Sequence, residues 1–92
     1  MNDDFEYDGL RAVLTCHACP EQYAVYKGDE EIGYIRLRHG HLYATEGDAG
    51  GSKIYEAETR GDGMFYDEKE REYHLKRILK LLHRAYNERK AV

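Results

Sequence analysis

The stretch from Ile32 to Thr45 constrains the fold most, because it has the pattern of two alternating β-strands joined by a tight turn. A glycine at the second turn position, after a residue type that tolerates a positive φ, is typical of a two-residue type I′ hairpin. The pair His39-Gly40 meets this requirement. A loop of these two residues sets the register: Arg38 faces His41, Leu37 faces Leu42, Arg36 faces Tyr43, Ile35 faces Ala44, and Tyr34 faces Thr45.

The two faces of this hairpin differ in chemistry. Neighbouring side chains on a strand point to opposite faces, so one face has the apolar residues Ile35, Leu37, Leu42 and Ala44. The other face has Tyr34, Arg36, Arg38, His41, Tyr43 and Thr45. Burying two arginines without partners costs free energy, so we expect this second face to meet solvent, acidic groups or a ligand.

The rest of the chain predicts an α+β fold, with an antiparallel meander of about four to five strands packed by one long C-terminal helix. Strand patterns cover residues 10–15, 22–27, 31–38 and 41–45, and a short one covers 53–57. Residues 67–89 predict the helix, because apolar residues from Tyr73 to Tyr86 recur at helical spacing and Asp67 can cap its start. The 92 residues predict a single domain (1–92). Residues 1–8 are expected to be a flexible acidic arm that becomes an edge strand when docked.

The charge is uneven along the chain. The net charge is −4, which argues against non-specific DNA binding. Residues 1–66 hold 6 basic and 13 acidic side chains, whereas residues 67–92 hold 8 basic and 5 acidic ones. An acidic body with a basic terminal segment can self-associate or dock on a charged partner. We expect a homodimer, because a small sheet with exposed edges gains core by pairing.

Neither a membrane span nor a signal peptide is predicted. There is no run of about 18 apolar residues, and the acidic start Met1-Asn2-Asp3-Asp4 lacks the basic and apolar regions of a secretory signal. The predicted location is therefore the cytoplasm, where two cysteines are more often free thiols or metal ligands than a disulfide.

Cys16 and Cys19 form a Cys-x-x-Cys pair, which is half of a tetrahedral zinc site. His17, His39 and His41 are the further candidates nearby in the sequence, but Glu46 and Ala49 stand where a second thiol pair would be needed. The preferred interpretation is two ordinary thiols, with no metal and no cofactor. A small zinc-stabilised module, a degenerate ribbon, is the alternative.

No motif in the chain predicts an enzyme, since none makes a serine or cysteine a nucleophile and none forms a phosphate loop. The polar hairpin face is the candidate ligand-binding site: Tyr34, Arg36, Arg38, His41 and Tyr43. Rings that stack and guanidinium groups that fork onto phosphate suit an anionic aromatic ligand such as a nucleotide. The alternatives for this face are a plain surface with arginines paired to Glu30, Glu31 or Glu46, and a face covered by a second protomer.

Two strings resemble short proteins encoded by phages and prophages: Cys16-His17-Ala18-Cys19-Pro20-Glu21-Gln22-Tyr23 and Gly33-Tyr34-Ile35-Arg36-Leu37-Arg38-His39-Gly40. Small acidic phage proteins are often counter-defence factors, which sequester a signalling nucleotide or block a host protein. The resemblance implies these two functions in the host cytoplasm and assigns no residue. The leading hypothesis is a non-catalytic binding protein for an anionic aromatic ligand. The second is an inhibitor or adaptor that binds a host protein through its acidic surface.

Overall fold

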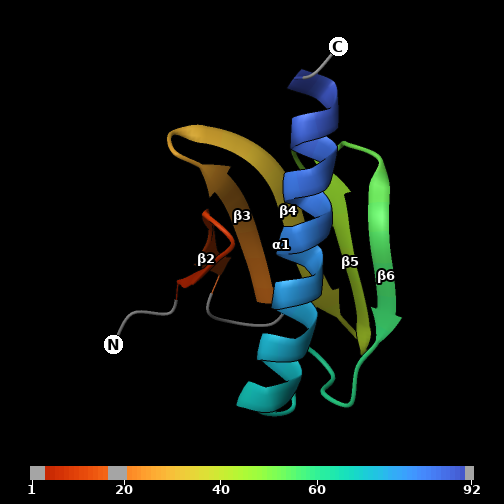
Figure 1. Cartoon of the computed structure of the whole chain (residues 1–92). Helices are drawn as coiled ribbons and strands as arrows, with labels where there is room; N and C mark the ends of the chain where they lie inside the picture. Colours follow the sequence, from red (N-terminus) through yellow and green to blue (C-terminus); the bar gives the residue numbers. More distant parts are fainter. Residues whose placement is uncertain (1–3, 17–20, 91–92) are drawn as a thin grey trace.

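The computed structural model describes residues 4–16 and 21–90 and has one sheet and one long helix (Figure 1). The six strands are β1 (Phe5–Tyr7), β2 (Leu10–Cys16), β3 (Glu21–Lys27), β4 (Glu30–Arg38), β5 (His41–Glu46) and β6 (Lys53–Glu58). All pairs are antiparallel and the spatial order follows the chain. The helix α1 (Glu68–Lys90) crosses one face of this meander, so the predicted fold class is confirmed. Within the described ranges no helix is long and apolar enough to cross a membrane.

The β4–β5 hairpin has the predicted turn and register. His39 has a φ of 55° and Gly40 a φ of 74°, the two positive values that a type I′ turn requires. Each predicted pair is present, from Arg38 opposite His41 to Tyr34 opposite Thr45. The turn thus fixes which side chains of β4 and β5 share a face.

The first strand is one more than the sequence predicted. Phe5–Tyr7 pairs with β2, where the sequence predicted an arm that becomes a strand only when docked. The turn Asp8-Gly9 explains the pairing, because both residues have positive φ values, 59° and 79°. Residues 1–3 of the predicted arm lie outside the described residues.

The core lies between α1 and the apolar face of the sheet. Ile35, Leu37, Leu42 and Ala44 are 0% exposed, as predicted. They belong to one cluster with the helix residues Leu75, Ile78, Leu79 and Leu82, which are at most 1% exposed. The predicted apolar stripe of the helix therefore covers the predicted apolar face of the hairpin, except at Tyr73, which is 56% exposed and was wrongly predicted to belong to the stripe.

A cap and a side-chain carboxylate hold the start of α1. The Asp67 side chain accepts a hydrogen bond from the Glu70 backbone N–H at 2.8 Å, which confirms the predicted cap. The Glu70 carboxylate turns back to accept the backbone N–H groups of Tyr66 and Arg60, each at 2.7 Å. The segment between β6 and α1 is thereby tied to the first helical turn.

A buried polar cluster joins the first turns of α1 to β3. Arg71 Nε donates to the Tyr23 hydroxyl at 2.9 Å, and this hydroxyl donates to the Glu21 carboxylate. The same carboxylate accepts the Phe65 backbone N–H at 3.2 Å. Burial, followed by the hydrogen bond to Glu21, raises the pKa of Tyr23 and keeps the phenol neutral. Each member has a partner inside the protein, so this cluster orients the helix on the sheet.

Candidate functional site

The five predicted site residues lie together on the face of the sheet opposite α1, called the open face below. β4 places Tyr34, Arg36 and Arg38 there, and β5 places His41 and Tyr43 beside them, through the register of the hairpin. Arg38 is exposed and the other four are half-buried. Because α1 covers the other face (Figure 1), the helix shields none of the five from an incoming ligand.

Two tyrosines form the aromatic part of the open face. The ring centroids of Tyr34 and Tyr43 are 6.5 Å apart with a tilt of 55° between the planes. The Tyr34 hydroxyl donates to the Gln22 side-chain oxygen at 2.7 Å, and burial raises the pKa of this phenol. The Lys53 ammonium lies 5.2 Å from the Tyr43 ring centroid. Both rings are therefore held in place before any ligand arrives.

Two arginines stand between these rings and the hairpin turn without an acidic partner. Neither Arg36 nor Arg38 forms an ion pair with a carboxylate of the residues that the structure describes. The predicted alternative of pairing with Glu30, Glu31 or Glu46 is thus not what the described side chains do. Arg36 Nε is buried and has no hydrogen-bond partner, an arrangement that costs about 1–3 kcal/mol for a polar group. The rest of the Arg36 side chain is only half-buried, so a ligand would meet its guanidinium and not this nitrogen.

His41 has a different setting from the other four. Its Nε2 lies 3.0 Å from a Glu56 oxygen and its Nδ1 lies 3.0 Å from a Glu58 oxygen. The hydrogen bond to Glu58, and then that to Glu56, raise the pKa of His41 and favour the imidazolium. Both ring nitrogens are thus occupied, and His41 joins β5 to the acidic edge of β6 instead of reaching freely outward.

Sheet pairing adds residues that the hairpin pattern did not predict. Gln22 stands opposite Arg36, and Glu56 stands opposite Tyr43, so one row across four strands reads Gln22, Arg36, Tyr43 and Glu56. Glu56 also accepts from Lys53 at 3.2 Å, which contributes most to lowering the Glu56 pKa. The open face therefore has arginines in the middle and a paired acidic group toward β6. These two residues could have been found by extending the register of the hairpin to β3 and β6.

The predicted zinc ligands are only partly described. Cys19 lies outside the described residues, and of Cys16 only its place at the end of β2 is described. His39 is exposed, with its Nδ1 4.0 Å from an Asp62 oxygen. Among the side chains that the structure describes, no group of three or more His, Cys, Asp or Glu could hold a metal ion. Two ordinary thiols, the preferred interpretation, stay a prediction, and zinc binding by Cys16 and Cys19 stays its alternative.

His74 is the buried titratable group on the helix side. It is 8% exposed, with its Nδ1 2.8 Å from the Tyr55 hydroxyl and its ring stacked near Phe65 at a centroid distance of 6.1 Å. Burial lowers the pKa of His74 and favours the neutral imidazole. This aromatic cluster joins α1 to β6 and to the loop that precedes the helix.

Comparison of the chain with protein-family models, with curated proteins and with solved structures finds no match. The geometry of the open face is therefore the basis for a functional proposal.

Proposed function

We propose that the protein is a non-catalytic binding module that captures an anionic aromatic ligand, such as a nucleotide, on the open face of its sheet. The observation that carries this proposal is the pair Arg36 and Arg38, which has no acidic partner within residues 4–16 and 21–90 and lies beside two tyrosine rings. α1 does not cover this face.

Each part of the open face fits one part of such a ligand. Residues two apart on a strand are about 7 Å apart at their Cα atoms, so Arg36 and Arg38 can reach the same phosphate or two neighbouring ones. Arginine is the side chain that forks onto phosphate oxygens through its guanidinium N–H groups. The rings of Tyr34 and Tyr43 offer surfaces on which a base can stack.

The acidic edge limits the charge of the ligand. Glu56 and Glu58 lie on β6 and hold His41 from both sides, so the positive region is confined to β4 and its neighbours. A ligand with few negative charges is therefore favoured over a triphosphate, whose further phosphates would approach carboxylates. The resemblance to phage proteins would make capture of a signalling nucleotide a counter-defence function.

Isothermal titration calorimetry against a panel of cyclic and linear nucleotides tests the proposal. We expect at least one to bind the unmodified protein, and Arg36→Ala/Arg38→Ala to weaken that binding at least about 100-fold, because each of the two charge-assisted contacts contributes about 1.5–3 kcal/mol. Arg60→Ala/Arg89→Ala removes the same charge away from the open face and should bind as the unmodified protein does. Absence of binding to every nucleotide, or unchanged affinity of the first variant, would refute the proposal.

A second candidate is an inhibitor or adaptor that binds a host protein through an acidic surface. The observation that favours it is the β3–β4 turn, where Asp29, Glu30 and Glu31 are consecutive and exposed. A pull-down from host lysate should then enrich one protein, and Asp29→Lys/Glu31→Lys should lose it while nucleotide titrations stay unchanged. If no specific band is found, this candidate fails independently of the first.

A further inference from the structure

The outer surface of α1 has a basic stripe that the open face does not involve. We define the helix stripe as Tyr73, Arg77, Lys80 and Arg84, which follow one another at three- or four-residue spacing and are all exposed. From Tyr73 to Arg84 the helix has four basic residues and no acidic residue, although the whole chain has a net charge of −4. The stripe is therefore a local positive region on an acidic protein.

The cations of the helix stripe have no ionic partner, whereas the neighbouring Lys76 has one. Lys76, just outside the stripe, is paired with Glu72 at 2.8 Å, and this pairing raises the pKa of Lys76. Lys80 and Arg84 form no ion pair with any carboxylate in the described part of the chain. The Arg77 guanidinium lies 5.2 Å from the Tyr73 ring centroid, which holds it along the helix surface.

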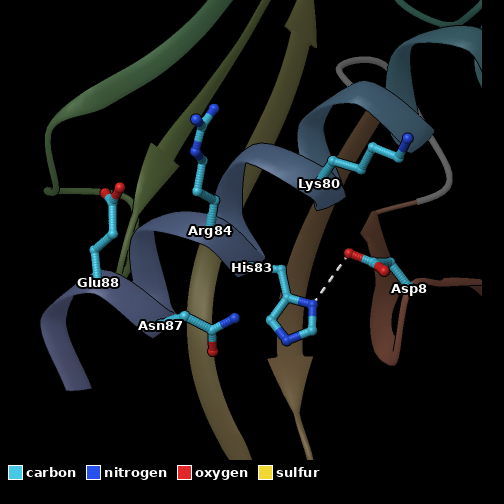
Figure 2. A pocket seen from close by; sticks show the side chains of 6 residues that line it. All are labelled: Asp8, Lys80, His83, Arg84, Asn87 and Glu88. Carbon is cyan, nitrogen blue, oxygen red and sulfur yellow. Dashed lines mark hydrogen bonds and ion pairs between the residues drawn. The ribbon is translucent and has the colours of Figure 1, made fainter. Parts of the chain in front are cut away.

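The surface around the helix stripe is hollowed on two sides. A depression of about 320 Å³ is lined by Arg77, Lys80, Leu81 and Arg84. A second, of about 560 Å³, is lined by Lys80, His83, Arg84, Asn87, Glu88 and Asp8. Figure 2 shows that His83 turns toward Asp8, with 3.1 Å between Nδ1 and the carboxylate, while Lys80 and Arg84 point away from that pair. The two cations thus remain available on the rim that the depressions share.

We propose that the helix stripe is a docking surface for an acidic helical segment of a partner protein. The stripe is about 16 Å long, which is three turns of helix at 1.5 Å per residue. Carboxylates repeated every three or four residues on a partner helix would meet Arg77, Lys80 and Arg84 in the same order. Tyr73 and the half-buried Leu81 add the aromatic and apolar contacts that protein interfaces require.

The charges around the helix stripe favour an acidic polypeptide over other anions. Glu72, Asp8 and Glu88 flank the stripe and would repel the closely spaced phosphates of a nucleic acid. A second copy of this chain offers no matching helix, because α1 has its acidic residues mainly in the first turn, where Glu70 binds backbone N–H groups. A partner helix can place its carboxylates between the flanking ones and avoid them.

The test uses a fluorescently labelled helical probe peptide of about 20 residues, with glutamates at three- and four-residue spacing and leucines beside them. Fluorescence anisotropy should show binding that weakens as salt rises. Lys80→Glu/Arg84→Glu should weaken it about tenfold or more, since each exposed pair contributes up to about 1 kcal/mol and reversal adds repulsion. Arg89→Glu/Lys90→Glu makes the same charge change at the helix end and should stay within about twofold.

Three results would overturn the proposal. A probe with glutamine in place of glutamate could bind equally well, which would exclude recognition by charge. Duplex DNA of similar length could bind more tightly than the acidic probe, which would assign the stripe to nucleic acid. Sedimentation velocity could show self-association that Lys80→Glu/Arg84→Glu abolishes, which would assign it to a second copy. If that variant does not fold by circular dichroism, Lys80→Gln/Arg84→Gln replaces it.

Discussion

Gly33 leaves room for the Leu82 side chain of α1, and replacing it tests how the helix is docked. A Cβ atom at Gly33 would lie 2.5 Å and 2.8 Å from the two Leu82 methyl carbons and 3.2 Å from its Cγ. Leu82 is 1% exposed, and Gly33 is paired on both sides, with Val25 and with Glu46. Neither the side chain nor the strand can move away freely, so Gly33→Ala should overpack the core.

The expected magnitude comes from two opposing effects. Overpacking a well-packed core costs about 1–3 kcal/mol. Alanine restricts the unfolded chain more than glycine does, which raises the free energy of unfolding by about 0.4–1 kcal/mol. We therefore expect Gly33→Ala to lower the free energy of unfolding by about 1–2 kcal/mol, as the difference between these effects. A domain of this size then melts about 4–8 °C lower for each kcal/mol.

A double-mutant cycle with Leu82→Ala separates this contact from other causes. Leu82→Ala alone should cost about 2–5 kcal/mol, because it leaves a cavity. In that background the new methyl group at position 33 has room, so Gly33→Ala should be neutral or stabilising. The coupling free energy between the two substitutions should then reach about 1 kcal/mol or more. Urea unfolding followed by circular dichroism measures all four proteins. Gly50→Ala, in an exposed loop, is the control and should change stability by no more than about 0.5 kcal/mol.

Additivity of the two substitutions would refute the reasoning. If the free energies sum within about 0.5 kcal/mol, then Leu82 does not lie over Gly33. α1 would in that case lie on the sheet in a different rotation or position from the one described.

Three further predictions concern the polar groups that hold the fold. Arg71→Ala should cost about 2 kcal/mol in urea unfolding, because it leaves the buried Tyr23 hydroxyl without its charged donor. Asp67→Ala should cost about 1 kcal/mol and Asp67→Ser much less, as measured by thermal melting, because serine can still cap the helix. His74 has a lowered pKa in the folded protein, so stability should fall as pH drops through about 6.5, where the unfolded chain takes up the proton. His41 has a raised pKa in the folded protein, so its contribution to the free energy of unfolding is full below about pH 6.5 and is lost as pH rises through the pKa of the folded state. Unfolding measured at several pH values should show that His74→Gln removes the loss of stability toward acid pH and that His41→Gln removes the loss toward higher pH.

The hairpin and the helix could be predicted because each depends on nearby residues. His39-Gly40 allows one turn type, and that turn determines which side chains of β4 and β5 face each other. The apolar stripe from Leu75 to Tyr86 has one partner large enough to cover it, the apolar face of the sheet. The five site residues share one face for the same reason.

What the sequence did not predict depends on residues far apart in the chain. Glu58 pairs with His41 through the β5–β6 register, and a register shift between Ala44 and Thr45 alters that pairing farther along. The state of His41 could therefore not be derived from the hairpin alone. β1 is a different case, because its turn, Asp8-Gly9, is recognisable from the sequence alone. The strand itself was not predicted, since three residues are too few to show the alternating pattern of a strand.

The distribution of unpaired cations connects the two proposed surfaces. The chain has 18 acidic and 14 basic side chains, so carboxylates are in excess and every arginine or lysine could have one. Within the ranges that the structure describes, Arg36 and Arg38 on the open face and Lys80 and Arg84 on the helix stripe have no ionic partner, and the same holds for Lys27, Arg60, Lys69, Arg77, Arg89 and Lys90. Pairing Arg36 internally would remove the cost of its buried Nε, and the fold forgoes that gain. The buried Nε is therefore what separates Arg36 from the other unpaired cations. The two surfaces lie on opposite sides of the molecule, so a nucleotide on one and an acidic helix on the other could bind at the same time.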